Sequence, residues 1–337
     1  MPSTPLANRR VSDGATFRNT DRIHRIGYRL GLYKRIVAGA LGRVPVRELV
    51  RTQFPFWMRD APMPPLLSVE LTNHCNLACG YCTNPTTTRP RGMMSEATFS
   101  RVVDEIARIR VPRVALCGNG ESTLHPRFPE YVRRLARAAP WVSLTSNWQR
   151  IRDEIVLACL ESLQLINISV DGGGRVDYER RRLGGRFEAL LGNLDRLASL
   201  KRSTRSRTLV NLRVMLDASD LDREKEILGF WEPYADVVSK QYILDFRGHH
   251  PLGLKPDLEG RCTLPFKKLD LHWNGVVNLC SYSWMQTHQP EGLVLGNVDE
   301  TMLAAMWNGP VMRRYRAGHR RRDETLIPVC RGCPGRT

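Results

Sequence analysis

The chain has 337 residues, 42% of them hydrophobic, which suits one large or two medium folded domains. It shows no run of eighteen apolar residues and no signal-peptide pattern, so we expect a cytoplasmic protein without a membrane span. The net charge of +17 comes mostly from scattered arginines without a nucleic-acid recognition motif, so we expect no nucleic-acid partner, although an anionic substrate is compatible with this charge.

The first segment, residues 1–63, places apolar and arginine side chains at helical spacing between Asp21 and Gln53. Two interpretations are open: a basic helical extension packed on the main domain, or a helix that lies on a membrane surface. Glycines and a proline interrupt the apolar stripe, which favours the packed extension.

From Leu66 onward, short apolar runs rich in branched residues alternate with longer helical patterns, which predicts strand–helix units around a parallel sheet. Six strands are expected, at residues 66–71, 113–118, 142–146, 165–171, 209–216 and 237–244. Helices are expected between them, at residues 95–110, 130–138, 150–163, 187–201 and 222–231. Six units fall short of a closed eight-unit barrel. We therefore predict an α/β fold, a partial (β/α)6 TIM-like barrel over residues 64–250, with its chemistry at the carboxyl ends of the strands.

After His250 the pattern changes to short strands and turns. A hairpin is expected over residues 269–280, because Asn274 and Gly275 form a favoured two-residue turn between apolar runs. Four cysteines fall in this region. We therefore place a small cysteine-rich α+β domain at residues 251–337.

Nine cysteines in a chain without an export signal indicate metal binding or catalysis, because the cytosol keeps thiols reduced. Cys75, Cys79 and Cys82 form Cys-x3-Cys-x2-Cys directly after the first predicted strand. Three thiolates in a short loop can hold three irons of a four-iron cluster and leave the fourth iron open. Zinc is the alternative, but the sequence offers no fourth ligand nearby.

This spacing, with Tyr81 just before the third cysteine, resembles the signature of the radical S-adenosylmethionine (SAM) superfamily. The resemblance implies a [4Fe–4S] cluster that binds SAM through its open iron and reduces it to methionine and a 5′-deoxyadenosyl radical. It also implies an electron donor such as flavodoxin or ferredoxin.

Segments at the ends of later strands are similar to the SAM-contacting motifs of that superfamily. Residues 118–126 resemble its glycine-glutamate motif, in which glycines allow close backbone approach and Glu121 would face the SAM ammonium group. Asn147 lies in a segment of the Thr-Asn-Gly type, with Trp148 in place of glycine. The SAM-binding residues that the resemblance implies are Tyr81, Gly118, Gly120, Glu121, Asn147, Ser169, Asp171, Arg182 and Leu216.

Two of these assignments have alternatives. Arg182 aligns best with the arginine that meets the SAM carboxylate, for which a guanidinium group is well shaped, and Arg181 is the second choice. Leu216 would lie near the adenine, and a buried core position explains it equally well.

The last four cysteines occur in the order found in the SPASM/twitch extension of radical SAM enzymes. They are Cys262, Cys280, Cys330 and Cys333. A full extension has further cysteines after the terminal pair, so the resemblance implies one auxiliary [4Fe–4S] cluster here. Four thiolates would saturate that cluster and make it an electron relay or sink. A structural zinc is the alternative.

This layout resembles the dehydrogenases that oxidise aminocyclitol or sugar alcohols in aminoglycoside antibiotic biosynthesis. It implies a radical SAM oxidoreductase that abstracts hydrogen from a carbon of a small-molecule substrate, a sugar or aminocyclitol, and oxidises a secondary alcohol to a ketone. Arg247, just past the sixth predicted strand, is the candidate that would stabilise the developing oxyanion, and a surface arginine is the simpler interpretation.

Three other functions stay open. A redox-neutral epimerase of a sugar or peptide would need a hydrogen donor, for which Cys117 is the candidate. A ribosomal-peptide maturase often has a leader-binding domain, and residues 1–63 show no strand-rich pattern of that kind. A non-catalytic iron–sulfur protein would leave the SAM-contact motifs without a purpose.

Overall fold

The computed structural model describes residues 63–243, 253, 262–281, 292–331 and 333. The expectations for the helical extension at residues 1–62 and for Arg247 lie outside these residues. Within the described ranges, no helix has both the length and the apolar character that a membrane span requires.

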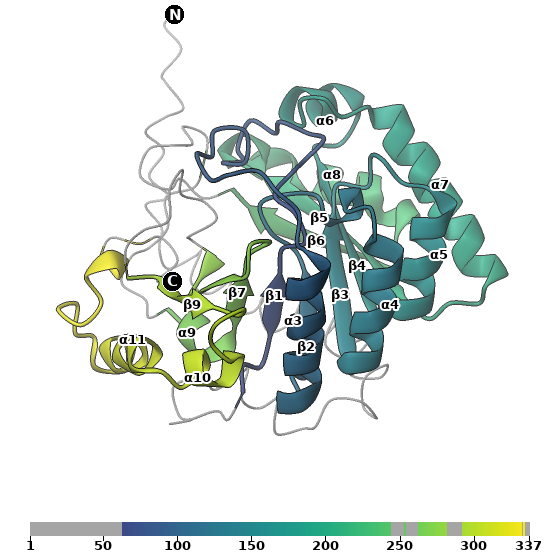
Figure 1. Ribbon diagram of the computed structural model, residues 1–337. Coiled ribbons are helices and arrows are strands. Elements are labelled where there is room, and N and C mark those ends of the chain that lie inside the picture. Colours follow the sequence, from purple (N-terminus) through teal and green to yellow (C-terminus); the bar gives the residue numbers. More distant parts are fainter. Residues whose placement is uncertain (1–62, 244–252, 254–261, 282–291, 332, 334–337) are drawn as a thin grey trace, which may run out of the picture.

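A nine-stranded sheet forms the centre of the molecule, in the order β6-β5-β4-β3-β2-β1-β7-β8-β9 (Figure 1). Neighbours among the first six strands all pair in parallel. These strands are β1 (Leu67–Val69), β2 (Arg113–Leu116), β3 (Trp141–Ser146), β4 (Leu165–Asp171), β5 (Leu209–Leu216) and β6 (Val237–Tyr242). All six predicted strands and the predicted partial barrel are confirmed.

Helices follow the strands in the predicted alternation. The main ones are α3 (Glu96–Ile109), α4 (Phe128–Ala138), α5 (Asp153–Ser162), α7 (Phe187–Ser203) and α8 (Glu224–Trp231). In α3 the Ser95 side chain accepts a hydrogen bond from the Thr98 backbone, and Phe99, Val102 and Ile106 bury one face of the helix. The short helix α6 (Arg175–Arg181) was not predicted, because its mostly polar residues show no apolar periodicity.

Alternate residues of the strands face two different environments. Val142 and Leu144 of β3 are fully buried in the core shared with the helices, whereas Ser143 and Thr145 are partly exposed. Successive side chains of a strand point to opposite faces. The helix-covered outer face is therefore apolar, and the inner face is more polar and partly accessible.

The C-terminal elements extend the barrel sheet beyond its β1 edge (Figure 1). Strand β7 (Leu269–Leu271) pairs in parallel with β1, and β8 (Val276–Asn278) and β9 (Val294–Asn297) continue antiparallel. The predicted hairpin is confirmed, and Gly275 has the positive φ of 82° that its turn requires. Helices α9 (Leu264–Lys267), α10 (Leu303–Trp307) and α11 (Pro310–Arg321) complete this part.

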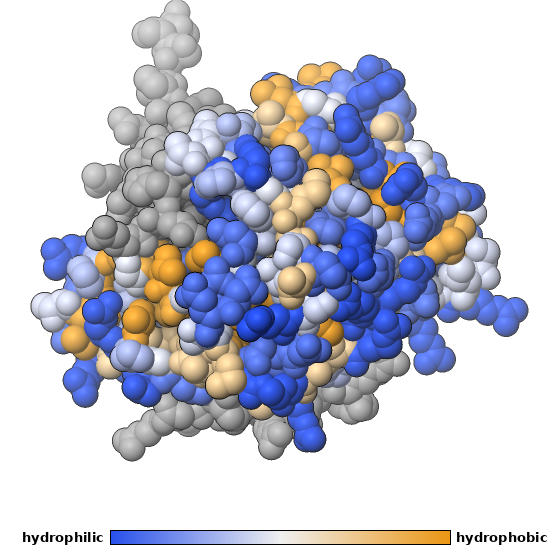
Figure 2. All heavy atoms as spheres, in the orientation of Figure 1, coloured by the Kyte–Doolittle hydropathy of each residue, from blue (hydrophilic) through white to orange (hydrophobic). Residues whose placement is uncertain are grey.

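Most of the face seen in Figure 2 is hydrophilic, and hydrophobic side chains occupy separate patches on it. Surface arginines form many ion pairs, such as Arg133 with Glu161. Such exposed pairs contribute at most about 1 kcal/mol each, so the stability of the fold rests on the buried core.

Candidate functional site

The first three cysteines lie in a loop that follows β1 and is tied to the segment after β4. Backbone amides of Ala78 and Gly80 donate to the carbonyls of Leu183 and Arg181, at 2.8 and 3.0 Å. The backbone amide of Cys82 donates to the Cys79 carbonyl at 3.0 Å. The loop is therefore held at the carboxyl ends of the barrel strands, where the sequence predicted the chemistry.

The thiols of this loop fit a bound cluster. Cys75, Cys79 and Cys82 are all free and partly exposed. Burial is the largest cause that raises the pKa of Cys75 to about 11 and of Cys79 to about 12, and the negative charge of a neighbouring thiolate acts in the same direction. Three thiolates this close together therefore need a cationic centre. Among the described residues, no three His, Cys, Asp or Glu side chains are close enough to bind a single metal ion together. A four-iron cluster needs no such convergence, because each thiolate binds a different iron.

Two glycines bring the loop after β2 against the cysteine loop. A Cβ atom at Gly120 would lie 2.3 Å from the Thr72 carbonyl oxygen, and one at Gly118 would lie 2.5 Å from the Glu70 side chain. The Glu121 backbone amide donates to the His74 carbonyl at 2.8 Å. The glycines that the sequence assigned to SAM contact are thus required for this close approach.

The Glu121 carboxylate is engaged within the protein. Its Oε1 accepts from the Thr123 hydroxyl at 2.7 Å, and its Oε2 accepts from the Asn147 backbone amide at 2.7 Å. Burial raises the pKa of Glu121, and these hydrogen bonds act in the opposite direction. Glu121 therefore joins the β2 and β3 ends, and its contact with the SAM ammonium group stays a prediction.

The end of β3 also contacts the cysteine loop. Asn147 Nδ2 donates to Asn76 Oδ1 at 3.0 Å and lies 3.8 Å from Cys75 Sγ. Trp148, which stands where the resembling motif has glycine, has a φ of 57° and is fully buried. The backbone thus keeps the left-handed conformation that glycine favours, although the side chain is large.

Three predicted SAM-binding residues meet at one point. Tyr81 from the cysteine loop donates to Asp171 Oδ2 at 2.9 Å, and Arg182 Nη2 donates to Tyr81 Oη at 2.8 Å and to Asp171 Oδ1 at 3.1 Å. Burial raises the pKa of Tyr81 well above its usual value. Arg181 instead pairs with Asp220 at 2.5 Å. Arg182 is therefore the arginine whose side chain contacts the cysteine loop, whereas Arg181 contacts it through its backbone carbonyl.

The other predicted residues divide between the two faces of the barrel. Ser169 and Cys117 are partly exposed, as are alternate residues of the inner face. Burial raises the pKa of the Cys117 thiol, and the charges of Lys268, Asp270 and Arg213 also act on it. Leu216 is fully buried in the core, and its adenine contact stays a prediction.

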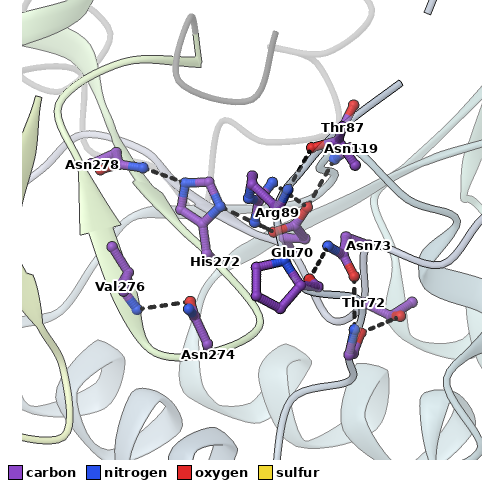
Figure 3. A network of polar contacts seen from close by, with 12 residues as sticks. Glu70, Thr72, Asn73, Thr87, Arg89, Asn119, His272, Asn274, Val276 and Asn278 are labelled. Atoms are coloured by element: carbon purple, nitrogen blue, oxygen red, sulfur yellow. Dashed lines mark hydrogen bonds and ion pairs between the residues drawn. The ribbon is translucent and has the colours of Figure 1, made fainter. Parts of the chain in front are cut away.

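A buried polar network that the sequence did not predict lies beside the cysteine loop (Figure 3). Glu70 Oε2 accepts a hydrogen bond from Arg89 Nη2 at 2.7 Å, and Glu70 Oε1 accepts one from the backbone amide of Asn119 at 3.1 Å. His272, just after β7, completes the network, because its Nδ1 lies 3.1 Å from the same Glu70 Oε2. A lone carboxylate in the apolar run Leu-Ser-Val-Glu-Leu is the signal that would have identified it.

The four C-terminal cysteines lie in the elements that extend the sheet beyond β1: Cys262 precedes α9, Cys280 follows β8, and Cys330 and Cys333 follow α11. Cys262 and Cys280 are buried, and Cys330 and Cys333 are partly exposed. Burial is the largest cause that raises the pKa of Cys262 to about 11, and the charge of Cys333 acts in the same direction. Burial likewise raises the pKa of Tyr315 to about 12, with contributions from Cys330 and Cys280. This donor set fits a thiolate-bound cluster.

Comparisons with known proteins agree with these two thiol sites. The radical SAM superfamily matches residues 69–225, and SPASM, an iron–sulfur cluster-binding domain, matches residues 262–334. The mycofactocin maturase MftC of Mycobacterium ulcerans is 32% identical over 142 residues, which are 42% of this chain and 37% of that protein. The matched part therefore spans little more than a third of that relative.

Solved structures show the same fold. BtrN in complex with AdoMet and 2-DOIA has a TM-score of 0.57 at 16% identity, covering 82% of this chain and 94% of that chain. Streptococcus suis SuiB bound to S-adenosylmethionine has a TM-score of 0.62 at 15% identity, covering 76% and 68%. The two family matches show that the chain contains a radical SAM domain followed by a C-terminal SPASM domain, and these domains imply a SAM-binding [4Fe–4S] cluster and auxiliary iron–sulfur binding.

Proposed function

We propose that this chain is a radical SAM dehydrogenase that oxidises a secondary alcohol of a carbohydrate or aminocyclitol to a ketone in antibiotic biosynthesis. The observation that carries the proposal is the position of Lys268. Its ammonium group donates to Asp270 Oδ1 at 2.9 Å and to the hydroxyl of Ser281, which directly follows Cys280. The charges of Cys117, on the inner face of the barrel, and of Cys280, in the second cysteine set, also act on this ammonium group. The inner face therefore adjoins the second thiol site, as electron transfer from a substrate held there requires.

The described side chains have distinct tasks in this proposal. Cys75, Cys79 and Cys82 would hold the first cluster, and the four C-terminal cysteines would hold the auxiliary cluster. When bound, SAM and its cluster supply a radical that abstracts hydrogen from an unactivated carbon. The polar inner face would orient the substrate, and the apolar outer face under the helices excludes water. Arg247 lies outside the described residues, and its role stays a prediction.

The first test counts irons and SAM cleavage. Anaerobically reconstituted wild type should hold about eight irons and form 5′-deoxyadenosine with SAM and dithionite, and a Cys75/Cys79/Cys82→Ala variant should hold about four and form none. Cys159→Ala is the matched control, because Cys159 is a buried core cysteine outside both sets. 5′-Deoxyadenosine from the triple variant would contradict the cluster assignment.

The second test concerns net oxidation. A panel of aminocyclitols and sugars is incubated with the reconstituted enzyme, and ketone formation is compared with SAM consumed. The dehydrogenase proposal expects one ketone per SAM. Turnover without a two-electron loss from the substrate would exclude it.

A peptide maturase is the second candidate, and the match to mycofactocin maturase favours it. The structural likeness extends to SuiB bound to the precursor peptide SuiA, at a TM-score of 0.62 and 14% identity. Peptides encoded beside this gene, tested in the same assay, separate the two candidates: a mass change in a peptide with no ketone from any polyol would favour the maturase.

An epimerase is the third candidate, and the partly exposed Cys117 on the inner face favours it. Its thiol would return hydrogen to the substrate carbon. In D2O, an epimerase reaction would place deuterium at that carbon, and Cys117→Ala would remove the incorporation. A dehydrogenase would place none there.

A further inference from the structure

Four polar side chains gather on the inner face where β4, β5 and β6 lie side by side. Asn167 is level with Asn211, and Arg213 is level with Ser239, so all four share one face. Asn211 Nδ2 donates to Asn167 Oδ1 at 2.8 Å, and Arg213 Nη2 lies 3.4 Å from the same oxygen. We call these residues the inner polar cluster.

Two atoms of the inner polar cluster have no partner. Asn211 Oδ1 and Ser239 Oγ are buried and find no hydrogen bond within the part of the chain that the structure describes. The two residues are only 1% and 3% exposed. A buried polar atom without a partner is costly, and such atoms normally bind water or a ligand. Asn211 and Ser239 are neighbours of Arg213 on this face, and Arg213 is partly exposed.

Within the described residues, the charges of the inner face leave Arg213 uncompensated. Three carboxylates that the described strands and their ends place on this face have cationic partners: Glu70 has Arg89, Asp171 has Arg182, and Asp270 has Lys268. Among the described residues, no carboxylate lies within ion-pair distance of Arg213. An anionic group that enters here would neutralise it in surroundings where charge is poorly solvated.

The inner polar cluster also lies close to the predicted chemistry. Arg213 is level with Ser169, which the sequence assigned to SAM, and its charge reaches the Cys117 thiol. A group bound at Arg213 would therefore place the rest of its molecule between the cysteine loop and the second thiol site.

We propose that the inner polar cluster binds a carboxylate or phosphate group of a hydroxylated substrate. Arg213 and Ser239 donate hydrogen bonds to the anionic oxygens, and Asn211 Oδ1 accepts one from a substrate hydroxyl. The inference deepens the proposed function and rests on it. It narrows the carbohydrates of the proposed function to those that carry an acidic group, the sugar acids and sugar phosphates, and it disfavours the aminocyclitols, whose ammonium groups Arg213 would repel.

The test measures binding to the reconstituted enzyme in the presence of SAM. Glucuronate, glucose 6-phosphate and neutral glucose are the probes, and the first two separate carboxylate from phosphate recognition. Wild type should bind at least one anionic probe about tenfold or more tightly than glucose, and Arg213→Gln should lose this preference. Arg213→Lys should restore part of it, and Ser239→Ala should weaken anion binding about threefold.

Arg207→Gln is the matched control, because Arg207 is exposed and lies just before β5. It should keep the preference for anions. Equal binding of all probes to wild type, or an unchanged preference in Arg213→Gln, would overturn the proposal. A weaker SAM affinity in Arg213→Gln would assign the arginine to SAM and also overturn it. Failure of the proposed function is seen separately, as SAM consumption by wild type without ketone formation from any probe that binds.

Discussion

His272 Nδ1 lies 3.1 Å from Glu70 Oε2, and both side chains are fully buried although 202 residues separate them in sequence (Figure 3). The same Glu70 oxygen accepts a hydrogen bond from Arg89, which follows the cysteine loop. His272 also contacts Asn278, two residues before Cys280. One carboxylate thus connects the surroundings of both thiol sites.

Replacement of the Glu70 carboxylate should lower the stability of the protein and the iron content of both thiol sites. Glu70→Gln leaves the buried Arg89 without its anion, and we expect a loss of about 3 kcal/mol or more in the free energy of unfolding. Denaturant unfolding and iron content of both sites are the measurements. Glu161→Gln, which breaks the exposed pair with Arg133, is the control and should cost under about 1 kcal/mol. Equal effects of the two variants would contradict the role of Glu70.

Glu70 should also give the stability a defined pH dependence. Burial alone would raise its pKa, but His272 and Arg89 outweigh burial and lower the pKa from 4.5 to about 2. A carboxyl group whose pKa is lower in the folded than in the unfolded state stabilises the fold. This stabilisation is complete at pH values above the unfolded-state pKa and is lost as the pH falls through the folded-state pKa. Relative to Glu70→Gln, wild type should therefore lose about 3 kcal/mol between pH 4.5 and pH 2. Parallel stability curves of the two proteins would exclude this assignment.

The glycine-glutamate loop predicts a steric effect. Gly120→Ala places a Cβ atom against the Thr72 carbonyl, so the loop must move away from the cysteines. We expect at least about a tenfold loss in the rate of 5′-deoxyadenosine formation. Gly192→Ala is the control, because a Cβ atom there meets nothing within 4 Å. That helical substitution should stabilise the protein by up to about 1 kcal/mol and leave SAM cleavage unchanged.

Because Arg182 contacts both Tyr81 and Asp171, its replacement should weaken SAM binding. Arg182→Gln leaves Asp171 buried without its cation, and we expect about a tenfold or greater loss in SAM affinity together with a lower melting temperature. Calorimetric titration with SAM and thermal unfolding measure the two effects. Arg180→Gln, which removes an exposed pair with Asp177, should change neither. Unchanged SAM affinity in Arg182→Gln would remove this arginine from the SAM site.

The second thiol site should be separable from the first. Cys262→Ala should lower the iron content from about eight to about four while reductive SAM cleavage persists, because the first three cysteines remain. Ketone formation should stop, since the electron acceptor is lost. Zinc in place of iron at this site would support the structural alternative.

Local patterns determined much of the fold. The alternation of Val142, Ser143 and Leu144 identifies a strand with one apolar face, and Asn274-Gly275 identifies a hairpin turn. Such signals involve residues within a few positions of one another, so they can be identified without knowledge of the rest of the chain. The same holds for the cysteine loop, whose spacing alone indicated a cluster with an open iron.

Trp148 shows where a local pattern is ambiguous. The sequence has a bulky residue where the resembling motif has glycine, yet the backbone keeps a positive φ. The burial of the indole and its hydrogen bond to the Asn193 carbonyl at 3.3 Å accompany this conformation. The hydrogen bond is made to a helix residue 45 positions away, so no pattern in the sequence around Trp148 indicates it.

The sequence by itself determined the strand–helix order, the two cysteine sets and the family resemblance, because each depends on short spacing. Only the tertiary structure decided that β7 lies beside β1, that Glu70 meets His272, and that Arg213 faces two unpartnered polar atoms. These relationships depend on which strands become neighbours and on which charges are already neutralised. Both follow from packing across the whole chain, where a residue's partner is set by three-dimensional proximity and not by its neighbours in sequence.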